Sequence, residues 1–159
     1  MSKTSDKTLI NRRTALELAG GGLIAAYMAG PLMSSANADA AMMAEAIKKL
    51  VGEGAIKEGK IKLDLPEIAE NGNTVPISVA IESPMTDADH VKAVHLFAEG
   101  NPLPNVATIN FSTMSGVAEA SLRMRLAGTQ NVVAVAEMSD GSLYTAKRQV
   151  KVTIGGCGG

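Results

Sequence analysis

Alternating apolar and polar positions dominate the chain after about residue 60. In residues 118–126 every second position is apolar, and Glu119, Ser121, Arg123 and Arg125 lie between them. Successive side chains of a β-strand point to opposite faces of a sheet, so this pattern predicts a strand with one buried face. Strands of this kind are expected at 60–65, 77–82, 91–97, 106–111, 118–126 and 132–135.

A last strand is predicted after Asp140-Gly141, which is a strong hairpin signal. In this strand Val150, Val152 and Ile154 are expected to face inward. Seven strands with a turn about every ten residues predict an all-β protein, an immunoglobulin-like β-sandwich.

One short helix is expected before the strands, over residues 40–51. Apolar residues recur at helical spacing there, and Gly52 ends the pattern. The residues of this apolar stripe are Met43, Ala46, Ile47 and Leu50.

Two of the predicted strands are apolar on both faces. In the first, Val91, Ala93 and Phe97 are expected on one face, and Val94, Leu96 and Ala98 on the other. Residues 132–136 behave in the same way. A two-sheet sandwich buries one face of each sheet, so the second face needs a cover. The leading helix and a partner subunit are both candidates. The partner is favoured because one short helix covers little of a sheet, with Val94, Leu96, Val133 and Val135 in the interface.

The first 38 residues resemble an export signal. Arg12 and Arg13 precede a weakly apolar run, residues 18–31, that is too short and glycine-rich to span a bilayer. Paired arginines before such a run are typical of a twin-arginine signal, and the small residues up to Ala38 fit a signal-peptidase site. We predict a leader at 1–38, cleavage after Ala38, a periplasmic protein and no membrane attachment afterwards. An ordinary secretory signal and an uncleaved amphipathic start are the alternatives.

Composition excludes some classes of function. The 159 residues carry a net charge of −1, so no basic stripe is available to bind nucleic acid. His90 and His95 are five positions apart, which places them on opposite faces of a strand and prevents them from sharing a metal. No catalytic triad spacing, phosphate loop or metal-ligand cluster occurs. The sequence therefore predicts a protein without its own active site, metal or cofactor.

The C-terminal segment 155–159 holds the most distinctive chemistry. Its residues are Gly155, Gly156, Cys157, Gly158 and Gly159, and Cys157 is the only cysteine in the chain. Glycines have little conformational preference, so we expect a flexible arm that follows a carrier domain at 39–154. An unpaired cysteine in an exported protein indicates intermolecular bonding or a reactive thiol. No cationic side chain adjoins it in sequence to activate the thiolate, which favours an attachment point served by other enzymes.

At this point the chain resembles a known family, the Y subunit of the Sox sulfur-carrier complex of thiosulfate-oxidising bacteria (SoxY). The C-terminal segment and residues 150–154 carry the resemblance. So do residues 66–76 (PEIAENGNTVP), 83–85 (SPM) and 123–130 (RMRLAGTQ). The similarity extends over essentially all of the predicted mature domain.

The resemblance implies that Cys157 is a covalent attachment site for sulfur. In the family, a c-type cytochrome enzyme joins thiosulfate oxidatively to this thiol as a cysteine S-thiosulfonate. A manganese-dependent hydrolase then releases sulfate and leaves a persulfide. Further partners, with a sulfane dehydrogenase as one candidate, clear the thiol. The family's Y subunit also forms a heterodimer with a Z subunit.

Two other kinds of protein share single features of this chain. Small cytosolic carriers convert a C-terminal Gly-Gly to a thiocarboxylate, and Gly158-Gly159 satisfies that requirement. The predicted leader argues against this class, because export removes the protein from ATP. A structural sandwich module that dimerises through Cys157 is the second alternative. Such a dimer would be sensitive to reductant and indifferent to thiosulfate.

Overall fold

The computed structural model describes residues 35–156, with the side chains of residues 40–156. These residues form one α-helix, nine β-strands and a 3₁₀ turn at Thr113–Ser115. The helix is α2 (Ser35–Val51). The strands are β1 (Ile56–Glu58), β2 (Ile61–Asp64), β3 (Ile68–Asn71), β4 (Val75–Ile81), β5 (Val91–Ala98), β6 (Asn105–Asn110), β7 (Ala118–Met124), β8 (Gln130–Met138) and β9 (Leu143–Ile154).

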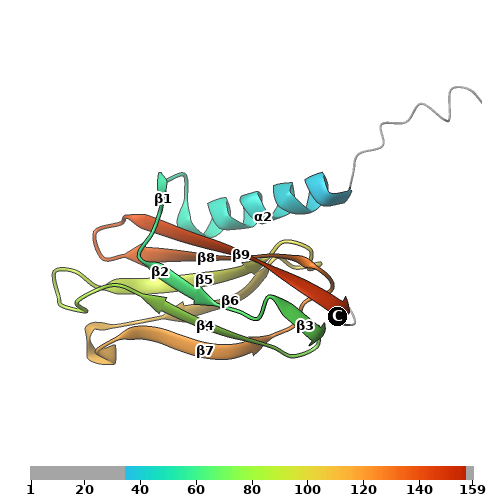
Figure 1. The fold of residues 1–159 in the computed structure, drawn as a ribbon. Coiled ribbons are helices and arrows are strands. Elements are labelled where there is room, and N and C mark those ends of the chain that lie inside the picture. The colour runs from blue at the N-terminus through green and yellow to red at the C-terminus, as the bar shows by residue number, and fades with distance from the viewer. Residues whose placement is uncertain (1–34, 157–159) are drawn as a thin grey trace, which may run out of the picture. The chain divides into compact units, whose positions relative to one another are not determined.

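The strands form two sheets that pack face to face (Figure 1). In the larger sheet, β1, β9, β8, β5 and β6 follow one another, and β3 pairs with the second half of β9. The smaller sheet has the order β2, β4, β7. β1 and β3 run parallel to β9, and every other pairing is antiparallel. The predicted all-β sandwich is confirmed.

The main core lies between the two sheets and follows the alternating pattern. In β4, Val75, Ile77, Val79 and Ile81 are buried, and the residues between them are not. These side chains meet apolar residues of β5, β8 and β9. The core contains no tryptophan and little aromatic area, so aliphatic packing supplies most of its stability.

The second face of the larger sheet is covered by α2, which corrects the prediction that a partner subunit covers it. Phe97, Val133 and Val135 form a separate buried cluster with Met43 of the helix. Val94 and Leu96 lie on the other face, in the main core, and are completely buried. The covering residues of α2 lie at 43–51, inside the predicted helix, so the cover was misassigned because periodicity identifies an apolar helix face but not the surface on which it packs.

The helix stripe also differs by one residue from the prediction. Met43, Ala46 and Ile47 pack on the sheet as expected, but Val51 completes the contact and Leu50 is 42% exposed. At 100° per residue, position 51 lies about 40° around the helix from position 47 and position 50 about 60° from it, so the last contact follows Ile47. Leu50 therefore lies at the margin of the packed stripe.

Three details of the strands also differ from the prediction. A bulge between Val91 and Ala93 turns Val91 into the main core, on the same side as Val94. The short strands β1 and β3 raise the number of strands from seven to nine. They were not predicted because an alternating pattern cannot be recognised in three or four residues. Ile154 is 68% exposed and does not face inward, since it lies at the very end of β9.

Within residues 35–156, no helix is both long enough and apolar enough to cross a membrane.

Candidate functional site

The predicted site residues fall mostly outside the residues that the structure describes. Arg12, Arg13, Cys157, Gly158 and Gly159 all lie there. Gly155 and Gly156 are described, and they connect the end of β9 to Cys157. The surroundings of these two glycines therefore define the site that the structure can show.

Gly155 and Gly156 lie in a backbone cradle made by the β3–β4 turn and the segment after β7. The Gly156 amide donates to the Leu126 carbonyl at 2.9 Å, and the Leu126 amide donates to the Gly72 carbonyl at 2.8 Å. The Gly72 amide in turn donates to the Ile154 carbonyl at 2.8 Å. We call Gly72, Leu126 and Ala127, together with the two glycines they hold, the C-terminal cradle. Figure 1 shows the end of β9 beside β3, where the cradle begins.

Glycine is required in the cradle because the backbones approach too closely for a side chain. A Cβ on Gly72 would overlap the Leu126 carbonyl oxygen and lie 2.6 Å from the Gly156 nitrogen. A Cβ on Gly155 would overlap the Ala127 carbonyl oxygen, and one on Gly156 would lie 2.9 Å from the Gly72 oxygen. Real side chains do not tolerate such distances from backbone atoms.

This geometry corrects the prediction that the arm begins at residue 155. Gly156 is buried and hydrogen-bonded, so the first two glycines serve close packing rather than freedom of movement. The sequence offered no local signal of this role, because the contacts join residues 72, 126 and 156. Of the predicted arm, only residues 157–159 lie beyond the cradle.

Asn101 and Gln130 fix the loops next to the cradle. The Asn101 side chain donates to the Arg125 carbonyl at 2.8 Å and accepts from the Ala127 amide at 3.0 Å. The Gln130 side chain, which is buried, donates to Asn101 and to the Gly128 carbonyl and accepts from the Gly100 amide. Each of these bonds satisfies a loop group that no strand pairs. The network holds residues 125–128 in a fixed path.

A hollow of about 470 Å³ lies beside the cradle. It is lined by Asn73, Asn101, Pro102, Leu103, Arg123, Met124 and Arg125. The Arg125 Cγ atom lies 2.9 Å from where a Gly156 Cβ would be, so the arginine stem touches the cradle. We call this feature the arginine hollow. Sequence reasoning gave it no role, because it forms only where two loops meet the end of β7.

The two histidines do not form a site with each other. The His95 side chain is 6% exposed beneath α2, and its Nδ1 lies 2.9 Å from the Thr108 hydroxyl. Its Nε2 has no partner among the described residues. Burial lowers the pKa of His95, and the charge of Glu137 opposes that effect. His90 is partly buried and lies 3.0 Å from the Thr86 carbonyl oxygen through its Nδ1.

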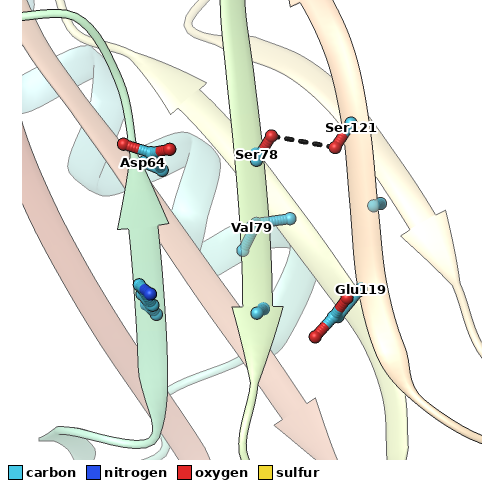
Figure 2. A pocket seen from close by; sticks show the side chains of 8 residues that line it. Asp64, Ser78, Val79, Glu119 and Ser121 are labelled. Atoms are coloured by element: carbon cyan, nitrogen blue, oxygen red, sulfur yellow. Dashed lines mark hydrogen bonds between the residues drawn. The ribbon is translucent and has the colours of Figure 1, made fainter.

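A second, smaller hollow of about 160 Å³ lies on the outer face of the β2–β4–β7 sheet (Figure 2). Asp64 and Glu119 lie on opposite sides of it, and the hydroxyls of Ser78 and Ser121 hydrogen-bond to each other at 2.8 Å near the top of the view. Among the described residues, neither serine side chain hydrogen-bonds to a histidine or a carboxylate that could activate it as a nucleophile. This hollow therefore has the character of an ordinary sheet surface.

In the part of the chain that the structure describes, no three His, Cys, Asp or Glu side chains come together as they would around a metal ion.

Comparison with known proteins identifies the family. The family model for the sulfur oxidation protein SoxY matches residues 47–157. The chain belongs to the SoxY family. The sulfur carrier protein SoxY from Chlorobium limicola f thiosulfatophilum has a solved structure that is 39% identical, with a TM-score of 0.61. That match covers 72% of this chain and 99% of the other.

Other structural matches share the fold alone. The superoxide reductase (neelaredoxin) from Ignicoccus hospitalis has a TM-score of 0.53 and 17% identity, and covers 59% of this chain and 80% of its own. A putative superoxide reductase from Thermotoga maritima has a TM-score of 0.52 and 17% identity, and covers 61% and 93%. A search of curated protein sequences gave no match.

Proposed function

We propose that this protein is a periplasmic sulfur carrier that holds thiosulfate-derived intermediates covalently on Cys157. The observation that carries the proposal is the family match, which extends to residue 157 and includes a sulfur carrier of 39% identity. Cys157 is the only thiol in the chain. The protein would act as the covalent substrate of partner enzymes rather than as an enzyme.

The proposed chemistry needs one oxidation and one hydrolysis. In the first, the Cys157 thiol and thiosulfate form Cys157–S–S–SO₃⁻, releasing one proton and two electrons, which a c-type cytochrome partner accepts. In the second, water cleaves the terminal sulfur–sulfur bond, giving sulfate, the persulfide anion Cys157–S–S⁻ and two protons. A manganese-dependent hydrolase is the expected partner, and a sulfane dehydrogenase or a sulfur acceptor would clear the persulfide.

The cradle supports a short and well-defined reach for the thiol. Gly156 is hydrogen-bonded and buried, and consecutive Cα atoms are 3.8 Å apart. The Cα atom of residue 157 is therefore one peptide unit away from a held position. The three residues beyond Gly156 span at most about 10 Å when extended, instead of about 17 Å for five. A partner enzyme would have to approach this end of the sandwich closely.

A heterodimer with a Z subunit is part of the proposal. Because Val94, Leu96, Val133 and Val135 are covered within this chain, the interface would use other surfaces. A charged residue at any of these four positions should destabilise the folded protein, rather than act by weakening partner binding.

The decisive experiment compares the wild-type protein with Cys157→Ser in cells that oxidise thiosulfate. We expect natively purified wild type to carry a sulfur adduct on Cys157, and Cys157→Ser to carry none and to abolish thiosulfate oxidation. Peptide mapping by mass spectrometry separates this outcome from a thiocarboxylate at Gly159. Normal oxidation by the serine variant, or added sulfur only on the terminal carbonyl, would overturn the proposal.

A further inference from the structure

The arginine hollow places two cations beside the cradle. Arg123 and Arg125 are two positions apart at the end of β7, so they project from the same face. Both are exposed. Within residues 40–156 the ion pairs are Lys48–Glu53 and Lys92–Glu137, so no described carboxylate pairs with either arginine. Two like charges on one face disfavour each other, and an anion placed between them would relieve this repulsion.

The other residues that line the hollow hold the Arg125 backbone in place and add polar and apolar surface. Asn101 holds the Arg125 backbone through the bond to its carbonyl. The Asn73 side-chain amide lies in the lining and makes no hydrogen bond to another described residue. Leu103, which is 80% exposed, adds an apolar surface. Guanidinium groups bind planar or tetrahedral oxyanions through paired hydrogen bonds, and a polarisable sulfur atom suits the apolar side.

The hollow is also within reach of the attachment site. Arg125 touches Gly156, Asn73 follows Gly72 of the cradle, and Cys157 is bonded directly to Gly156. A group attached to Cys157 therefore starts one residue along the chain from Gly156, which Arg125 touches.

We propose that the arginine hollow receives the sulfonate end of a thiosulfonate group attached to Cys157, with Arg123 and Arg125 pairing with its oxygens. This inference rests on the proposed function, because it takes Cys157 to be the attachment site. Free thiosulfate offers the same oxyanion chemistry. However, exposed charges are screened by salt and bind a free anion weakly, whereas a short tether supplies a millimolar effective concentration. The occupant of the hollow is therefore the group attached to Cys157 and not free thiosulfate.

A partner-free reaction can load the group. Tetrathionate reacts with a thiolate, so that Cys157–S⁻ and ⁻O₃S–S–S–SO₃⁻ give Cys157–S–S–SO₃⁻ and thiosulfate. One sulfur–sulfur bond breaks, one forms, and no other oxidant is needed. Mass spectrometry verifies the loading. The Nε–H signals of Arg123 and Arg125 are then compared by ¹⁵N NMR in loaded and unloaded full-length protein.

We expect both arginine signals to shift on loading, and to stay unchanged when Cys157→Ser is treated with tetrathionate or millimolar thiosulfate. Unchanged signals in fully loaded protein would overturn the inference. Equal shifts with free thiosulfate in Cys157→Ser would also overturn it, since the hollow would then be a site for the free anion.

Loading rates provide a second readout with a matched control. Removing both positive charges in R123Q/R125Q should slow loading by the tetrathionate dianion about three- to tenfold at low salt, and less at high salt. Lys147 and Arg148 are exposed on β9 and do not line the hollow, so K147Q/R148Q, which also removes two positive charges, is the control and should load at nearly the wild-type rate. An equal slowing in K147Q/R148Q would assign the effect to net charge and refute the hollow.

The two proposals fail in different ways. If Cys157 carries no sulfur in cells, the proposed function fails, although chemical loading still tests the hollow. If Cys157 carries sulfur and the arginine signals do not shift on loading, the proposed function stands and the arginine hollow does not bind the attached group.

Discussion

Gly72→Ala is the substitution that tests the C-terminal cradle most sharply. The added methyl group would overlap the Leu126 carbonyl oxygen and lie 2.6 Å from the Gly156 nitrogen. Both are backbone atoms held by hydrogen bonds, so neither can rotate away as a side chain would. The backbone segments that follow β3, β7 and β9 must separate, which strains the bonds from the Gly72 amide to Ile154 and from the Leu126 amide to the Gly72 carbonyl.

The cost can be worked out from these contacts. Overpacking a close-packed site costs about 1–3 kcal/mol, and each weakened hydrogen bond about 1 kcal/mol. With two weakened bonds, the free energy of unfolding should therefore fall by about 3–5 kcal/mol, a large part of the 5–15 kcal/mol that is typical of a domain. With a urea dependence of about 2 kcal/mol per molar, the midpoint of unfolding would fall by about 1.5–2.5 M.

Gly128→Ala is the matched control, because a Cβ there would meet nothing within 4 Å. It should be neutral, or stabilising by up to about 1 kcal/mol through the unfolded state. Urea unfolding compares the two variants. Hydrogen exchange at the Gly156 amide provides a local readout, and it should become faster in Gly72→Ala alone. Equal midpoints and equal exchange rates in the two variants would refute the cradle.

Three further predictions concern the helix, the buried histidine and the leader. Met43→Ala should lower the free energy of unfolding by about 2–4 kcal/mol, because it leaves a cavity in the cluster under α2. Leu50→Ala, at the exposed margin of the helix, should change it by less than about 0.5 kcal/mol, and thermal unfolding distinguishes the two variants. Burial lowers the pKa of His95, so the unfolded chain takes up the proton first as the pH falls. The free energy of unfolding should therefore be highest above the ordinary pKa of 6.5 and decrease as the pH drops below it. A His95→Gln variant with the same pH dependence in urea unfolding would contradict this. Replacing Arg12 and Arg13 together by Lys should leave unprocessed protein in the cytoplasm, and normal processing seen by fractionation and immunoblotting would disprove a twin-arginine leader.

Local pattern was sufficient to predict most of the sandwich. The alternation in 118–126 correctly placed Ala118, Met124 and Leu126 in the core, and Asp140-Gly141 does form the β8–β9 turn. These signals depend on neighbours in the sequence, and the physics of strand pleating and turn geometry acts over the same short range.

The errors arose where the outcome depended on distant residues. Whether α2 or a partner covers Val133 and Val135 depends on how the helix docks, which periodicity does not report. The bulge beside Val91 changes a face through one extra residue, which the sequence pattern cannot distinguish from a regular strand.

The same limit applies to the candidate site. Cys157 stood out in the sequence because it is a lone cysteine among glycines, and its role as an attachment site is still a prediction. The glycines before it were misread, since glycine serves both freedom and close packing, and only the approach of Gly72 to Gly156 decides between them. The arginine hollow depends on residues from two loops and the end of β7, so no window of sequence contains it.

The most direct test of the central claim is the intact mass of the protein purified natively from cells growing on thiosulfate, followed by peptide mapping. We expect a chain cleaved after Ala38, part of which carries a thiosulfate-derived or persulfide group that maps to Cys157 and disappears on treatment with a reductant. A population that carries no sulfur under these conditions, or that carries it anywhere except Cys157, would contradict the account.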